Sequence, residues 1–372
     1  MPLPQQPIVH VVTGYLGSGK TLFLRQVLAR QAFSEPVAVI VNDFGSLVYD
    51  GLLLRSATHS QRAGVEIVEV PGGCLCCSAV DEFKDALEEL LQRGVRRVFI
   101  EATGLANAEQ VRCDVAMMGF PVESVFCVVD ALNVERLSAL FATVGEQIAA
   151  ADVVLIAKTD LLDHNTQASA LQAVHGLVRA LNSRAVVVYL SHGVLPSDFA
   201  ATVFAPPEHF VSQEPPQEFS PRGSNNHLFD DGITAFRVRV PAPVQAEALE
   251  KAFSRLPSSV VRVKGVLQID VESTNPVQPT THQPAEWFLV NIVCGRAEFL
   301  PLISEQLQDE EPPAQANAQA ELFVIGKHLS AVAIEQCFAP LQALVETGTV
   351  RYEGLVEHHA HQHHAHHLHH RS

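Results

Sequence analysis

The chain contains 372 residues, of which 47% are hydrophobic, and its length predicts two domains rather than one. Its 25 basic and 41 acidic residues give a formal net charge of −16. Such a charge repels phosphate backbones and anionic lipids, so we expect neither nucleic acid nor a membrane surface as a partner. No apolar run reaches the length that spans a bilayer, and the polar start of the chain lacks the basic region of a secretory signal; we therefore expect a cytoplasmic protein.

Short apolar segments of strand length recur through the first half of the chain. They are residues 8–13, 37–41, 66–70, 97–100, 124–129, 153–157 and 186–189. Helical patterns lie between most of them, among them residues 22–31, 81–92 and 167–181. Continuously apolar strands that alternate with helices indicate a mostly parallel sheet covered by helices on both faces. We therefore predict an α/β domain over residues 1–203.

The second half of the chain has a different pattern. Residues 204–232 are rich in Pro, Ser, Asn and charge and are predicted to be a linker. A smaller α+β domain is predicted over residues 233–357. Its strands are expected at 233–240, 260–267, 287–293 and 322–325, and its helices at 244–254 and 331–339. Residues 358–372 are of low complexity, and we expect this His-rich tail to be disordered.

A complete phosphate-binding motif, G-x-x-x-x-G-K-[ST], follows the first apolar segment. Its key residues are Gly14, Gly17, Ser18, Gly19, Lys20 and Thr21. The glycines let the loop curl so that backbone N–H groups converge on a β-phosphate at the start of the next helix. We expect Lys20 to contact the β- and γ-phosphates and the Thr21 hydroxyl to ligate Mg²⁺. The motif predicts that the first domain is a P-loop nucleoside-triphosphatase.

Two further motifs come directly after buried strands and are predicted to join the same site. Glu101 and Gly104 follow one of these strands. The acid can hold the Mg²⁺ shell or a water, and the glycine N–H can contact the γ-phosphate. The alternative is an ordinary strand-ending turn. Lys158 and Asp160 follow another strand. Asp160 can accept two N–H bonds from guanine, and adenine offers no such pair of donors. We therefore expect GTP as the nucleotide, with Lys20 and Glu101 as the catalytic residues.

Three cysteines, Cys74, Cys76 and Cys77, crowd together after the segment IVEV and a Pro-Gly-Gly turn. Thiolates in this arrangement favour Zn²⁺, Cu(I) or iron–sulfur chemistry over hard cations. Because three neighbouring sulfurs do not readily occupy three tetrahedral positions, Asp43 or a histidine is expected to complete the site. Buried structural cysteines and a redox sensor are the alternatives.

The remaining cysteines and the tail histidines are interpreted separately. Cys113, Cys127, Cys294 and Cys337 have apolar neighbours in the sequence and are predicted to be small core residues. The tail holds nine histidines that can exchange Zn²⁺, Ni²⁺ or Co²⁺, with a purification tag as the alternative. These nine are His358, His359, His361, His363, His364, His366, His367, His369 and His370.

The motifs GYLGSGKT, GGCLCCS, EATGLA, VVDALN and KTD, in this order, resemble those of the CobW-type metallochaperone GTPases, and RVKGVLQI and LFVIGKHL resemble the second half of that family. The resemblance implies a protein that binds and slowly hydrolyses GTP and carries a transition metal at the Cys-x-Cys-Cys turn. Residues 42–45 resemble the family's first switch segment. Two departures stand out. Ser46 replaces a second acid that the family often has, and Ala157 replaces the Asn or Thr that commonly opens the base-reading motif.

The leading hypothesis is a metallochaperone that carries zinc, with cobalt and nickel as alternatives, and delivers it to a client metalloenzyme or a metal-cofactor assembly protein. The second hypothesis is a metal store or buffer with incidental nucleotide turnover, and the third is a small-molecule kinase, against which Lys158, Asp160 and the cysteines argue. By family analogy the C-terminal domain is the docking surface for the client. A homodimer that depends on nucleotide or metal also stays open.

Overall fold

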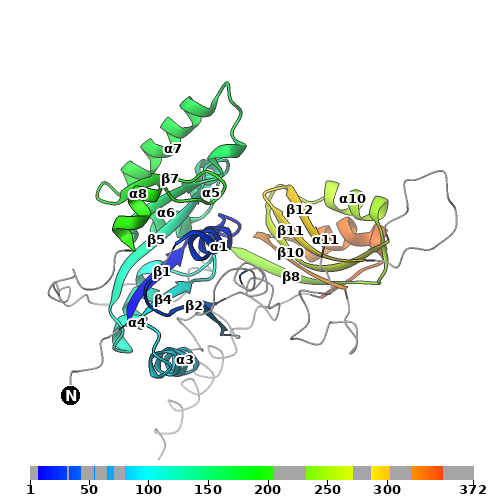
Figure 1. Cartoon of the computed structure of the whole chain (residues 1–372). Helices are drawn as coiled ribbons and strands as arrows, with labels where there is room; N and C mark the ends of the chain where they lie inside the picture. The colour runs from blue at the N-terminus through cyan, green and yellow to red at the C-terminus, as the bar shows by residue number, and fades with distance from the viewer. Residues whose placement is uncertain are drawn as a thin grey trace, which may run out of the picture. The chain divides into compact units, whose positions relative to one another are not determined.

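The structure is a computed structural model that describes residues 7–31, 33–42, 54, 65–70, 80–204, 232–270, 286–301 and 320–346. The chain divides into two compact units, of which the first contains the described residues up to 204 and the second those from 232 to 346. Figure 1 shows the helices and strands of each unit. The linker predicted over residues 204–232 lies outside the described residues except at its two ends, so its boundaries stay a prediction, and so does the nature of the tail.

Seven parallel strands form the sheet of the first unit, in the order β3-β2-β4-β1-β5-β6-β7 (Figure 1). The strands are β1 (Ile8–Thr13), β2 (Val37–Val41), β3 (Val65–Glu69), β4 (Arg97–Glu101), β5 (Val122–Asp130), β6 (Val153–Ala157) and β7 (Val186–Tyr189). The helices are α1 (Lys20–Arg30), α3 (Val80–Gln92), α4 (Ala108–Met117), α5 (Val134–Leu140), α6 (Ala142–Ala149), α7 (Gln167–Leu181) and α8 (Ser197–Val203). The predicted α/β fold with a parallel, helix-covered sheet is therefore confirmed.

The two faces of this sheet carry separate cores, which explains why the strands are apolar throughout. Val9 and Val11 of β1 pack in a cluster with α3 and α4, represented by Phe83 and Val111. Val12, the next residue along β1, belongs to a second cluster. In this cluster α1 and α8 cover the opposite face. Because successive side chains of a strand point to opposite faces, a strand buried on both sides has no polar positions.

The carboxyl ends of the strands meet at one edge of the sheet. Val12 at the end of β1 lies opposite Glu101 of β4, which in turn lies opposite Val41 of β2. Asp130 at the end of β5 lies opposite Ala157 of β6. In open α/β sheets, ligands bind outside this edge, at the point where the strand order reverses. Here that point is β1, whose neighbours are β4 and β5.

The opposite edge of the sheet contains a buried polar cluster that centres on Arg97. Its side chain is 1% exposed and forms an ion pair of 2.7 Å with Glu35. A second contact of 2.8 Å joins Arg97 Nη1 to Nε2 of His10, and Nδ1 of His10 lies 2.8 Å from Oγ of Ser124. The guanidinium also lies over the ring of Phe204, the last described residue after α8. The cluster therefore connects β1, β4, β5 and the segment after α8.

The second unit is an α+β domain built on a mainly antiparallel sheet, in the order β12-β11-β10-β13-β8-β14, with β9 paired to β10. The strands are β8 (Ile233–Val240), β9 (Val244–Gln245), β10 (Val260–Asp270), β11 (Glu286–Val293), β12 (Arg296–Pro301), β13 (Ala320–Lys327) and β14 (Leu344–Glu346). The helices are α10 (Ala246–Ser254) and α11 (Ala331–Phe338). Leu249 of α10 and Ile334 of α11 share one core with Val238 and Val324 of the sheet.

Two details of the second unit differ from the sequence prediction. The helix predicted over residues 244–254 begins at Ala246, because Val244 and Gln245 pair with β10 as the short strand β9. The strands β12 and β14 have no counterpart among the predicted elements. β12 is exposed along almost its whole length and β14 has three residues, so neither shows the apolar alternation on which a strand prediction depends.

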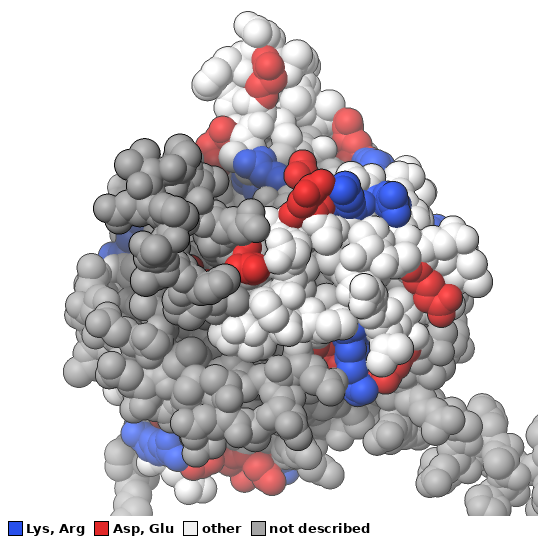
Figure 2. All heavy atoms as spheres, turned by 90° about the vertical axis from the view of Figure 1, so that its right-hand side faces the viewer, with Lys and Arg blue, Asp and Glu red and all other residues white. Residues whose placement is uncertain are grey.

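The surface of the described residues is mixed in charge. On the face drawn in Figure 2, acidic and basic side chains lie interspersed among uncharged ones. Among the described residues, no helix is both long enough and apolar enough to cross a membrane.

Candidate nucleotide-binding site

The glycine-rich loop follows β1 and leads directly into α1, as the motif predicts. Gly14 has a φ of 135°, a conformation that L side chains rarely adopt. A Cβ at this position would also lie 2.3 Å from the carbonyl oxygen of Val128 on β5. Glycine is therefore required at the point where the loop turns away from the sheet.

The N-terminus of α1 has features that favour an anion. Gly19 is its N-cap, and as a glycine it provides no side-chain cap for the N-terminal N–H groups. The first turn of α1 contains no acidic residue. Backbone N–H groups and the helix dipole together favour a negative group at such a terminus. Lys20, 6% exposed, folds back over the loop and donates a hydrogen bond of 2.8 Å from Nζ to the carbonyl of Gly14.

The predicted Mg²⁺ ligand and the predicted acid are in direct contact. Oγ1 of Thr21 donates a hydrogen bond of 2.7 Å to Oε1 of Glu101, which is 4% exposed. Residues 80 positions apart in the sequence are thus brought together because β1 and β4 are neighbours in the sheet. A hydroxyl and a carboxylate are hard oxygen donors of the kind that Mg²⁺ takes beside nucleotide phosphates, so the residues present fit this ion.

Gly104 lies against the phosphate loop. A Cβ at Gly104 would be 2.7 Å from both the backbone nitrogen and Cδ2 of Leu16. The turn that contains Gly104 is held from the other side by Gln147 of α6, a residue that is 1% exposed. Nε2 of Gln147 donates to the carbonyls of Gly104 and Ala106, at 3.2 and 2.9 Å. Sequence reasoning missed Gln147, because a glutamine inside an amphipathic helix has no signature of its own.

The turn after β6, which is predicted to read the base, is connected to the phosphate loop. Nζ of Lys158 donates to the carbonyl of Gly17 and to Oδ2 of Asp130, each at 2.7 Å. Asp160 accepts a hydrogen bond of 3.0 Å from the backbone N–H of His192, in the loop after β7. Sequence reasoning singled out Lys158 and Asp160 but gave no role to Asp130 or His192. The motif VVDALN, which contains Asp130, was the one signal that pointed to it.

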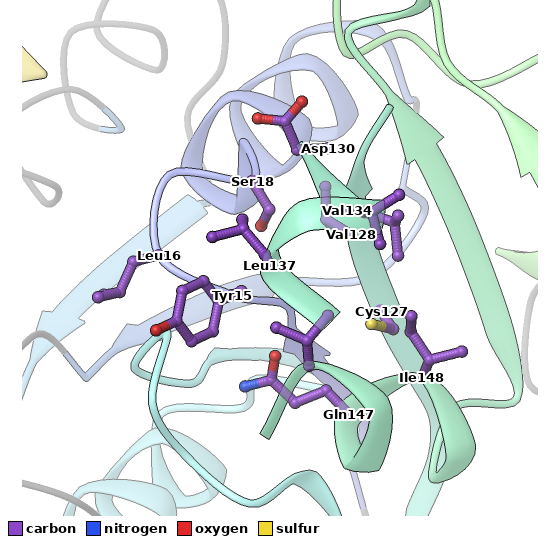
Figure 3. Close-up of a pocket in the computed structure, with 12 residues that line it drawn as sticks. Tyr15, Leu16, Ser18, Cys127, Val128, Asp130, Val134, Leu137, Gln147 and Ile148 are labelled. Carbon is purple, nitrogen blue, oxygen red and sulfur yellow. The ribbon is translucent and has the colours of Figure 1, made fainter. Parts of the chain in front are cut away.

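A small, mostly apolar cavity lies behind the phosphate loop (Figure 3). Tyr15, Leu16 and Ser18 of the loop line one side, and residues of β5, α5 and α6 line the rest. The ring of Tyr15 packs on that of Phe141, with centroids 5.0 Å apart. Figure 3 shows the carboxylate of Asp130 turned away from the apolar lining. The side chains that line the cavity, together with Phe141 against Tyr15, therefore pack behind the phosphate loop.

The predicted metal ligands lie outside the described residues. This holds for Cys74, Cys76, Cys77 and Asp43, for Ser46, and for all nine tail histidines. The strand that precedes the cysteines, β3, is the edge strand beside β2, and Val70 donates to the carbonyl of Val41 at 3.1 Å. Within the described ranges, no group of three or more His, Cys, Asp or Glu side chains could hold a metal ion.

The other cysteines are partly as predicted. Cys127 and Cys337 are buried, which confirms them as core residues, whereas Cys113 and Cys294 are of intermediate exposure. Burial raises the pKa of Cys127 to about 12, so its thiol stays protonated at neutral pH. The prediction of core positions for Cys113 and Cys294 is wrong to that extent, because one side of α4 and the turn between β11 and β12 face solvent.

A parallel sheet whose first strand leads through a glycine-rich loop into an uncapped helix N-terminus defines a P-loop nucleotide-binding protein. The nucleotide-binding domain of the CobW/HypB/UreG family matches residues 8–188. The cobalamin synthesis protein CobW C-terminal domain matches residues 233–342. The two domains occur in this order and together cover most of the chain. The protein therefore belongs to the CobW family.

The chain is also similar to individual proteins. The chain is 29% identical over 281 residues to the zinc chaperone YjiA of Escherichia coli (strain K12), across 71% of this chain and 82% of YjiA. It is 30% identical over 198 residues to the zinc-regulated GTPase metalloprotein activator 1 of Schizosaccharomyces pombe, across 50% of this chain and 46% of that protein. The crystal structure of Zn(II)-bound YjiA GTPase from E. coli aligns with 90% of this chain and 99% of its own, at 22% identity and a TM-score of 0.39.

Proposed function

We propose that this protein is a GTPase metallochaperone that binds zinc at the Cys-x-Cys-Cys turn and delivers it to a client metalloprotein in a nucleotide-dependent way. The observation that carries the proposal is the contact of 2.7 Å between Thr21 and Glu101, because it places a hydroxyl and a carboxylate together beside the phosphate loop. Membership in the CobW family supports the GTPase activity. Several relatives are zinc chaperones by name, which supports zinc as the metal.

Each nucleotide contact has a candidate residue at the carboxyl edge of the sheet. The loop from Gly14 to Thr21 would surround the phosphates, and Lys20 would exchange the carbonyl of Gly14 for a phosphate oxygen. Thr21 and Glu101 would hold Mg²⁺, which supplies positive charge beside the transferred phosphoryl group. Gly104 would sense the γ-phosphate from its position against the loop.

The base would be selected by the turn after β6. Lys158 lies over the carbonyl of Gly17, so its stem would border the nucleotide, and Asp160 would accept the guanine N–H groups. His192 now donates its backbone N–H to Asp160 from the loop after β7. That loop would therefore form the far wall of the base site.

The sheet order supplies a physical path between metal and nucleotide. β3 and β2 are neighbours in the sheet. The cysteines follow β3 in the sequence, and Asp43 follows β2. The backbone N–H of Asn42 donates to the carbonyl of Glu101 at 3.0 Å. The segment after β2 therefore starts between the strand of the cysteines and the strand of Glu101. Ordering of that segment by the γ-phosphate would add or withdraw a metal ligand, with a coupling of about 1–3 kcal/mol.

An anaerobic Zn²⁺ titration tests the proposal. We expect the Zn²⁺ affinity to differ about 5- to 150-fold between the chain bound to a non-hydrolysable GTP analogue and the chain bound to GDP. Replacing Cys76 and Cys77 by Ser should abolish the tight site, whereas Cys113→Ser is a matched control that should keep it. Equal affinities in the two nucleotide states would contradict the coupling.

A chain that lacks residues 358–372 separates delivery from storage. A chaperone keeps its tight site at Cys74–Cys77 after the deletion, whereas a storage protein loses most of its capacity. We further propose a cytoplasmic location and a client metalloenzyme or cofactor assembly protein as the partner. Transfer of ⁶⁵Zn from the loaded chain to candidate apo-metalloenzymes, with GTP and without it, would identify that partner.

A further inference from the structure

Lys158 has a backbone conformation that is unusual for its residue type. Its φ is 61°, in the left-handed region that non-glycine residues seldom occupy. Such strained positions persist only where the surroundings determine them, and they concentrate at functional sites. A neighbour in the fold must therefore hold Lys158 in place. Ala157, the residue before it, has no polar side-chain group that could do so.

The neighbour is Asp130, which ends β5 directly opposite the end of β6. Its carboxylate is only 4% exposed and lies 2.7 Å from Nζ of Lys158. Two further bonds orient the carboxylate itself. The backbone N–H of Leu132 donates to Oδ1 at 2.9 Å, and Nδ2 of Asn133 donates to Oδ2 at 3.0 Å. Both partners of the ion pair thus have a defined place before any ligand binds.

We propose that Asp130 is the positioning residue for Lys158: it holds the ammonium group against the carbonyl of Gly17, so that the lysine stem is fixed beside the phosphate loop, where a guanine nucleotide would bind. Asp130 itself does not touch the nucleotide. This inference rests on the function proposed above, in which Lys158 borders the base.

The physical reason is preorganisation. A lysine side chain has four rotatable carbon–carbon bonds and loses much rotamer freedom when a ligand orders it. A buried carboxylate that already binds the ammonium removes that cost from nucleotide binding, as rigid binding groups do in general. The tie also connects the base-reading turn to the phosphate loop. Thr159 adds a second anchor, through a bond of 2.7 Å to the carbonyl of Leu190.

Asp130 also stabilises the turn that follows it, so the test must separate this local role from the proposed one. Asp130→Asn keeps an amide oxygen for the N–H of Leu132 and removes the negative charge that faces Lys158. Asp152→Asn is the matched control. Asp152 precedes β6 at the opposite edge of the sheet, where it pairs with Arg112 at 2.7 Å and accepts the N–H of Val125.

The experiment is a GDP titration of the full chain as wild type, Asp130→Asn, Lys158→Met and the double variant, with the Asp152→Asn control. We expect Asp130→Asn to weaken GDP binding about tenfold, because a charge-assisted bond that orients Lys158 is lost. Lys158→Met should weaken it to a similar extent. The double variant should bind GDP no more weakly than Lys158→Met alone, because residues that act through one another are not additive.

Each other outcome is decisive. Additive losses in the double variant would show that Asp130 acts on the fold and not through Lys158, which overturns the inference. An unchanged GDP affinity of Asp130→Asn overturns it as well, while the proposed function stands. A wild-type chain that binds no GDP removes both the inference and the function on which it rests. If Asp152→Asn weakens GDP binding to the same extent, the loss of any carboxylate has this effect, and the inference is overturned.

Discussion

At the scale of single residues, the candidate site depends on close approaches that only particular side chains allow. Thr21 reaches Glu101 because a short hydroxyl side chain at the start of α1 faces the end of β4. Lys20 is long enough to return to the carbonyl of Gly14. Gly104 leaves room for Leu16 because it has no Cβ. We therefore expect each of these positions to tolerate few substitutions, and Gly104 allows a direct steric test.

Gly104→Ala should lower both the stability of the first unit and the affinity for GTP. The new methyl group would lie 2.7 Å from the backbone nitrogen of Leu16, which is not the flexible end of a side chain. Overpacking of this kind costs about 1–3 kcal/mol. Urea denaturation and titration with a non-hydrolysable GTP analogue measure the two effects.

Gly176→Ala on α7 is the control for that substitution, because a Cβ there meets nothing within 4 Å. It should stabilise the helix by about 0.5–1 kcal/mol and leave nucleotide binding unchanged. If Gly104→Ala behaves like Gly176→Ala, the close approach to Leu16 does not constrain the site.

Cys127 should resist alkylation in the folded chain. Burial raises the pKa of its thiol to about 12, and the thiolate is the reactive form. Iodoacetamide at pH 8, followed by peptide mass spectrometry, should modify the partly exposed Cys113 faster than Cys127. Addition of Zn²⁺ should leave the protection of Cys127 unchanged; a zinc-dependent change would show that this cysteine takes part in metal binding.

At the scale of elements, helix α6 supports the turn after β4 although the two are distant in the sequence. Gln147 supplies hydrogen bonds to two carbonyls of that turn, and Tyr15 of the phosphate loop packs on Phe141, the residue before α6. Helix α6 and the residue that precedes it thus contact both parts of the candidate γ-phosphate site. This arrangement explains why a buried polar side chain is kept inside an otherwise apolar cluster.

Gln147→Leu should destabilise the first unit by about 1–3 kcal/mol, because it leaves the buried carbonyls of Gly104 and Ala106 without their donor. It should also slow GTP hydrolysis more than it weakens GDP binding, since GDP lacks the γ-phosphate that Gly104 would sense. Denaturation curves and single-turnover hydrolysis measure the two effects. Gln172→Leu, on the exposed side of α7, is the control and should change neither.

The elements themselves were largely predictable from the sequence. Strands β1, β2, β6 and β7 and helix α7 have the bounds that the apolar segments indicate. The prediction failed for strands that are mostly exposed and for residues whose conformation depends on pairing with a distant strand. β12 is an exposed strand, and Val244 and Gln245 belong to β9 only because β10 lies beside them. Pairing across elements could not be read from a local pattern: nothing in the sequence marked Gln147, and the motif VVDALN contained Asp130 without showing its contact with Lys158.

At the scale of the whole first unit, the buried cluster of His10 and Arg97 joins three strands at the edge opposite the site. Burial and the neighbouring charge of Arg97 lower the pKa of His10 from 6.5 to about 3. The unfolded chain therefore binds a proton at this histidine below about pH 6.5, whereas the folded chain does not until about pH 3. Folding is thus opposed more strongly as the pH falls through this window.

The free energy of unfolding should decrease by up to about 1.4 kcal/mol for each pH unit between about pH 6 and pH 3 through His10 alone. His10→Gln removes the titrating group and should flatten this dependence, whatever its effect on stability at neutral pH. Urea denaturation at a series of pH values measures both slopes. Parallel slopes for the two chains would show that His10 does not contribute.

The sequence by itself determined that the protein has a phosphate loop, a Lys-x-Asp turn after a buried strand, a cysteine cluster and two domains, because each of these depends on a contiguous run of residues or on local periodicity. Only the tertiary structure decided which distant residues meet. It placed Glu101 against Thr21, because β4 lies beside β1 in the sheet although β2 and β3 separate the two strands along the chain. It also placed Asp130 against Lys158 at the neighbouring ends of β5 and β6, and Gln147 of α6 against Gly104, because the packing of the sheet and its helices sets which side chains meet.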